Sequence, residues 1–111
     1  MITNRNQNAP VLLRRRVILT HGLIFDAQRE VILPIQPFVG LVLYNATWSP
    51  PDSDDSEDRI EEIAYDLKSG RLICYLRRDD YRPESSGSND WIEDDVIEHY
   101  RDWTLQREET R

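Results

Sequence analysis

The side chains best suited to acid–base chemistry are His99 and Asp95, four positions apart near the C-terminus. On a helix this spacing places the carboxylate one turn before the imidazole, where it would orient His99 as a general base. The alternative is a histidine at the core boundary that hydrogen-bonds Asp95. We favour this alternative because no nucleophile or second base is evident near His99. The sequence therefore predicts no catalytic residue.

Cys74 is the only cysteine, so it has no partner for an intramolecular disulfide. His21 and His99 belong to other predicted elements, and no signature motif supports a Cys/His catalytic pair. We expect Cys74 to be an inert thiol inside a sheet, as is common in reducing compartments. The expected location is therefore the cytoplasm. No apolar run reaches the roughly 20 residues of a membrane-spanning helix, so we also expect no membrane segment.

Five acidic side chains crowd residues 49–58, which we call the acidic loop: Asp52, Asp54, Asp55, Glu57 and Asp58. Their oxygens would suit a hard cation such as calcium, but the loop lacks the glycine and the distal glutamate of an EF-hand. We therefore predict neither a metal site nor another cofactor. The remaining interpretations are a solvated loop and a docking surface for a protein with a basic surface.

Trp48 directly precedes the acidic loop. Tryptophan is enriched among residues that anchor protein interfaces, although a tryptophan at a strand end also commonly covers one side of a core. Trp48 and the five loop carboxylates are accordingly our candidate partner-binding residues.

Arg14, Arg15 and Arg16 form the one basic cluster in the sequence. A phosphate-contacting role would require aromatic or further basic residues nearby, and the flanking sequence contains neither. We expect these arginines either to protect an edge strand from aggregation or to pair with the acidic C-terminal part of the chain. Residues 1–47 carry a net charge of +3 and residues 48–111 a net charge of −10, which gives −7 overall. This balance disfavours direct binding to nucleic acid.

The segment 60–78 predicts an antiparallel hairpin whose turn is centred on Ser69 and Gly70. In this register one face is apolar and the ends are paired by charge, whereas a slip of one residue mixes acidic with apolar side chains. The expected cross-strand pairs are Leu67/Leu72, Tyr65/Cys74, Ile63/Leu76, Glu62/Arg77 and Glu61/Arg78.

Other strands are predicted from the spacing of apolar residues. Alternation favours a strand over 17–25, followed by a polar turn at 26–30. Two further strands are expected at 31–35 and 38–48. The second is apolar on both sides as far as Tyr44, so we expect it at the centre of the sheet.

The last predicted element is a helix that begins after Asp90. Glu93 follows this cap residue at the spacing of a capping box. The helix has an apolar stripe that should pack on the sheet, with His99 beside it: Ile92, Val96, Tyr100 and Trp103.

These elements predict an α+β fold. We expect an antiparallel sheet of about four or five strands, either curved or barrel-like, with one C-terminal amphipathic helix packed on it. Residues 11–108 should form a single domain of which the acidic loop is part. Residues 1–10 and 109–111 are expected to be flexible ends.

The scarcity of catalytic groups and the negative charge favour a small acidic cytoplasmic protein-interaction or regulatory module without catalytic activity of its own. One alternative is an acidic mimic of nucleic acid, of the phage or mobile-element type, which would inhibit a basic nucleic-acid-binding protein. A second alternative is a small enzyme or enzyme subunit. The expected partner is another protein, and we expect neither a membrane nor nucleic acid to bind directly. The sequence does not define the oligomeric state.

Overall fold

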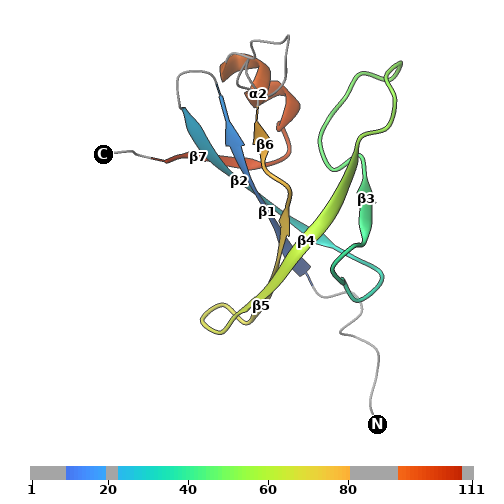
Figure 1. The fold of residues 1–111 in the computed structure, drawn as a ribbon, viewed down its shortest axis with the longest axis vertical. Coiled ribbons are helices and arrows are strands. Elements are labelled where there is room, and N and C mark those ends of the chain that lie inside the picture. The colour runs from blue at the N-terminus through green and yellow to red at the C-terminus, as the bar shows by residue number, and fades with distance from the viewer. Residues whose placement is uncertain (1–9, 20–22, 81–92, 109–111) are drawn as a thin grey trace.

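The computed structural model describes residues 10–19, 23–80 and 93–108, which form a strand-rich fold with one short helix (Figure 1). The strands are β1 (Pro10–Ile18), β2 (Ile24–Ile32), β3 (Val42–Tyr44), β4 (Glu57–Asp66), β5 (Arg71–Leu76), β6 (Asp79–Asp80) and β7 (Thr104–Arg107), and the helix is α2 (Glu93–His99). The expected flexible ends, apart from Pro10, and the Asp90 cap lie outside the described residues. No helix in the described ranges is long and apolar enough to cross a membrane.

The strands form one mixed sheet in the order β3-β4-β5-β1-β2-β7, with β6 also paired to β1. β1 pairs antiparallel with β2 but parallel with β5, where Leu13 lies opposite Cys74. β3 and β7 are the two edges, so the sheet is open. The expectation of a purely antiparallel sheet with four or five strands is therefore wrong. The sequence pattern misses the parallel β1–β5 pair because this pair joins segments far apart in the chain.

One face of the sheet carries the core, and we call it the inner face. Along β1 it receives Val11, Leu13, Arg15 and Val17, all buried, while the alternate residues lie on the outer face. The apolar stripe of the C-terminal segment packs on the inner face, since Val96, Tyr100 and Trp103 are buried in the same cluster as Val17. This confirms the predicted stripe apart from Ile92, which lies outside the described residues.

The predicted hairpin is present as β4 and β5, but its register is shifted by two residues. Tyr65 lies opposite Leu72 and Ile63 opposite Cys74, so the same side chains share a face with different partners. The predicted pairs of Glu62 and Glu61 with Arg77 and Arg78 are also wrong. The turn is longer than the predicted one. Asp66 accepts hydrogen bonds from the Lys68 and Gly70 amides, and Gly70 has a φ of 72°.

Several predicted strand boundaries are wrong. No single strand covers 17–25, because β1 ends at Ile18 and the antiparallel β2 begins at Ile24, while residues 20–22 lie outside the described ranges. The Leu19 amide donates a hydrogen bond to the Leu23 carbonyl just beyond these strand ends. The expected turn at 26–30 lies inside β2. The expected central strand at 38–48 contains only the short edge strand β3, and Phe38, Val39 and Tyr44 are exposed. β7 is an additional strand after the helix, where no strand was expected.

Candidate functional site

The segment that carries Trp48 is fixed to the end of α2. The Ala46 carbonyl accepts hydrogen bonds from Trp103 Nε1 at 2.9 Å and from Arg29 Nη1 at 2.6 Å. The Trp48 amide donates to the His99 carbonyl at 3.0 Å. These contacts hold the half-buried Trp48 beside the last turn of the helix, and Figure 1 shows the acidic loop at the same end of the sheet as α2.

A surface groove of about 410 Å³ lies at this junction, lined by Trp48, Ser49, Pro50, Asp95, Glu98 and His99. Trp48 and Pro50 provide apolar surface, and Asp95 and Glu98 provide negative charge from α2. We call this the Trp48 groove. The Arg101 guanidinium lies 3.9 Å from the centre of the Trp48 ring, in a cation–π contact, and is not among the lining residues.

His99 forms part of the wall of the Trp48 groove, together with Asp95. Burial lowers the pKa of His99, and a backbone hydrogen bond with Trp48 and the charge of Asp79 act against that decrease. The ring also packs edge-on against Tyr100, with 5.2 Å between the ring centres. A neutral imidazole at pH 7 is the consequence, so His99 does not add positive charge to the groove.

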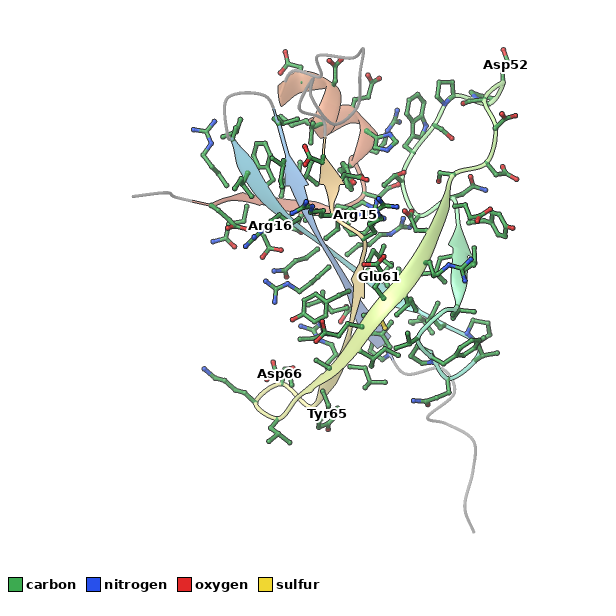
Figure 2. The ribbon with its side chains drawn as sticks, viewed as in Figure 1. Arg15, Arg16, Asp52, Glu61, Tyr65 and Asp66 are labelled. Atoms are coloured by element: carbon green, nitrogen blue, oxygen red, sulfur yellow. The ribbon has the colours of Figure 1, made fainter. Side chains whose placement is uncertain are left out.

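The acidic loop carries four exposed carboxylates, which do not line the Trp48 groove: Asp52, Asp54, Asp55 and Glu57. Figure 2 shows Asp52 at the tip of the loop, pointing away from the sheet. Asp55 accepts a hydrogen bond of 3.2 Å from Asn45, whose side-chain oxygen in turn accepts from the Ser56 amide. Asn45 therefore ties the returning arm of the loop to the end of β3.

Asp58 does not belong to this exposed group, although the sequence placed it there. It lies in β4 and accepts a hydrogen bond from the buried Arg15, which also donates to Asp79 and to the Tyr100 hydroxyl at 3.1 Å each. The Tyr100 hydroxyl donates in turn to Asp79. Burial by itself would lower the pKa of Arg15, but Tyr100, Asp79 and Asp58 raise it above its ordinary value. Asp58 is therefore a structural ion-pair partner.

The three neighbouring arginines separate onto the two faces of the sheet. Arg15 points inward, whereas Arg14 and Arg16 lie on the outer face and pair with Asp26 and Glu108. β1 is flanked on both sides, so the edge-strand interpretation is wrong. Pairing with the C-terminal part is confirmed for Arg15 and Arg16.

Cys74 is buried within β5, as expected, and burial raises the pKa of its thiol. Among the described residues, no group of three or more His, Cys, Asp or Glu side chains is arranged to hold a metal ion.

Sequence reasoning missed that Pro50 and Glu98 share a groove with Trp48. Their proximity depends on the contact between segment 46–48 and the end of α2, for which the sequence gives no local signal. A signal did exist for Arg15, because it occupies a buried position in the alternation of Val11, Leu13 and Val17. A comparison of the chain with protein-family models, curated proteins and solved structures found no match.

Proposed function

We propose that this protein is an interaction module that binds a basic segment of another protein in the Trp48 groove. The observation that carries the proposal is the combination of an indole with two carboxylates, Asp95 and Glu98, along one groove. The aliphatic stem of an arginine or lysine would pack on Trp48 and Pro50 while its cationic head meets Asp95 and Glu98.

The chain itself supports a preference for guanidinium groups. Arg101 already stacks on the Trp48 ring, so an indole at this position accommodates a guanidinium at a distance of 3.9 Å. The exposed carboxylates of the acidic loop extend the negative surface beyond the groove. They would accelerate encounter with a basic partner more than they would tighten the final complex.

A titration with short peptides tests this proposal. The probes are an arginine-containing peptide and the same peptide with citrulline in place of arginine, which removes the positive charge and preserves the shape. We expect the arginine peptide to shift the Trp48 indole NMR resonance saturably and the citrulline peptide to bind more weakly. Equal binding of both peptides, or a Trp48 resonance that does not respond, would contradict the proposal.

A matched pair of variants locates the contact. Glu98→Gln should weaken the arginine peptide by about two- to fivefold, the range for one exposed ion pair. Glu61→Gln is the control, because Glu61 is also an exposed acid but lies midway along β4 (Figure 2). This control should bind like the wild type.

A second candidate is the acidic mimic of nucleic acid, which is favoured by the exposure of Asp52, Asp54, Asp55 and Glu57. In that case the loop carboxylates would occupy the positions of nucleic-acid phosphates on a basic nucleic-acid-binding protein. The affinity of the complex would then fall steeply as the salt concentration rises. The inward position of Asp58 reduces the charge available for mimicry.

A further inference from the structure

A second concave surface lies on the outer face of the sheet, opposite the core. It has a volume of about 320 Å³. Its lining residues come mainly from β1 and from the segment that begins with β5: Arg14, Arg15, Arg16, Asp26, Tyr75, Leu76, Arg78 and Glu108. We call it the arginine groove. It provides what the flanking sequence of Arg14–Arg16 lacks, an aromatic ring and a further basic residue, both contributed by the chain that follows β4.

An irregularity in the parallel pairing brings Arg78 to this groove. Arg14 lies opposite Tyr75 and Val17 opposite Asp79, so three steps along β1 correspond to four steps along the β5–β6 segment. The extra residue reverses the alternation of side chains between Tyr75 and Asp79. Asp79 can therefore point inward to Arg15, while Arg78 lines the outer groove beside Tyr75.

Two carboxylates hold the strand arginines in place. Asp26 accepts a hydrogen bond of 2.7 Å from Arg14, which is the main cause that raises the pKa of Arg14. Glu108 accepts two hydrogen bonds from Arg16, at 3.2 and 3.3 Å. A guanidinium has five N–H donors, so each of these arginines keeps donors for another ligand. Arg14 also lies 5.8 Å from the centre of the Tyr75 ring.

Arg78 differs from both. It is exposed and, within residues 10–19, 23–80 and 93–108, it makes no ion pair. Four arginines and two carboxylates line the groove, and Arg15 is compensated by Asp58 and Asp79 on the inner face. The other three arginines still exceed the two carboxylates, which is a local positive excess in a chain with a net charge of −7. Such an excess would attract an anion to this position.

We propose that the arginine groove binds the phosphate group of a small molecule. The planar guanidinium matches the oxygens of a phosphate in a bidentate contact, and positioned arginines are therefore suited to this group. Tyr75 offers a ring on which a nucleotide base would stack. The groove volume lies at the lower end of the range for small-ligand sites, about 300 to 1,000 Å³.

The test measures binding of pyrophosphate, inorganic phosphate and AMP to the full chain by calorimetry, with potassium chloride at matched ionic strength as the reference. We expect saturable binding of at least one phosphate compound and none of chloride. Binding of inorganic phosphate or pyrophosphate equal to that of AMP would identify the phosphate group as the sole determinant. Tighter binding of AMP, lost in Tyr75→Leu, would identify a nucleotide.

Two neighbouring variants make the test specific. Arg78→Gln should weaken phosphate binding by about tenfold, the effect of losing one strong charge-assisted contact. Arg77→Gln removes the same charge from an adjacent exposed arginine that does not line the groove, and it should bind like the wild type. Because Arg78 makes no ion pair among the described residues, its replacement should leave the melting temperature in chloride unchanged.

Three results would overturn the proposal. The first is the absence of saturable binding by the wild type. The second is an equal loss in Arg77→Gln and Arg78→Gln, which would indicate attraction by overall charge. The third is full binding by Arg78→Gln with an unchanged melting temperature, which would place the anion elsewhere.

Discussion

Asp58 and Asp52 carry the same side chain in very different surroundings. Asp52 is exposed at the tip of the acidic loop, whereas the Asp58 side chain is 14% exposed and meets Arg15, whose side chain is 3% exposed. A buried guanidinium is costly unless carboxylates compensate its charge, and Asp79 and Asp58 share this role. Position in the fold, and not residue type, therefore separates a structural acid from a candidate binding acid.

Replacing Asp58 should consequently destabilise the fold. We expect Asp58→Ala to lower the free energy of unfolding by about 3 kcal/mol, the lower end of the range for breaking a buried ion pair, because Asp79 still compensates Arg15. Asp52→Ala should change stability by less than about 0.5 kcal/mol. Urea denaturation of the two variants measures both values. A small effect of Asp58→Ala would mean that Arg15 does not depend on this partner.

His99 provides a pH-dependent prediction at the same scale. Burial lowers its pKa in the folded state below the ordinary value of 6.5. As the pH falls through that value, the unfolded state takes up the proton first, so this residue's contribution to stability is lost on acidification. The charges of Asp79, Arg15 and Asp58 act on His99, and Asp95 and Glu98 line the same groove. A substitution of His99 alone leaves all of these groups in place.

The comparison is between the wild type and His99→Gln in urea denaturation at about pH 7.5 and about pH 5.5, on either side of the histidine range. We expect the wild type to lose more stability than the variant between these two conditions. An equal loss in both proteins would show that other groups cause the acid sensitivity.

At the scale of elements, the sequence predicts what depends on local pattern. The hairpin around Ser69 and Gly70 and the buried stripe through Val96, Tyr100 and Trp103 follow from alternation and helical spacing, and both are present. The hairpin register was wrong by two residues because a shift of two preserves which side chains share a face. Hydrophobic pattern alone does not distinguish these two registers.

Elements that depend on distant pairing were not predictable in this way. The parallel pair of β1 and β5, the edge strand β7 and the Trp48 groove all require contacts between segments that are far apart in the chain. Residues 38–48 were misplaced at the sheet centre because their apolar side chains suggest burial on both sides. In the fold, Leu41 and Leu43 pack against the core while Phe38 and Tyr44 face solvent.

Trp103 connects helix packing to the Trp48 groove. It is 8% exposed, packs edge-on with Tyr100 and donates to the Ala46 carbonyl, which helps to fix the segment leading to Trp48.

Trp103→Ala should therefore lower the free energy of unfolding by about 3 to 5 kcal/mol because it leaves a large cavity. Trp103→Phe keeps most of the volume but loses the hydrogen bond, so it should cost less. Thermal or urea denaturation of both variants checks the order, and a loss under about 1 kcal/mol for Trp103→Ala would contradict it.

At the scale of the whole molecule, the two candidate sites carry opposite charge on different parts of the fold. The Trp48 groove is acidic and lies where α2 meets the acidic loop, whereas the arginine groove is on the outer face of β1 and β5. The overall charge of −7 would favour long-range attraction of basic partners. Local arrangement, and not net charge, would then decide what binds at each groove.

The last prediction distinguishes groove binding from mimicry of nucleic acid. A variant that neutralises Asp52, Asp54, Asp55 and Glu57 but retains Asp58 removes the exposed loop charge without disturbing Arg15. If the Trp48 groove anchors the partner, the arginine-containing peptide should lose little affinity, about threefold or less, and its salt dependence should become shallower. Isothermal titration at two salt concentrations provides these values. A loss beyond about a hundredfold, about 2.7 kcal/mol, with most of the salt dependence abolished, would instead assign binding to the loop charges and favour mimicry.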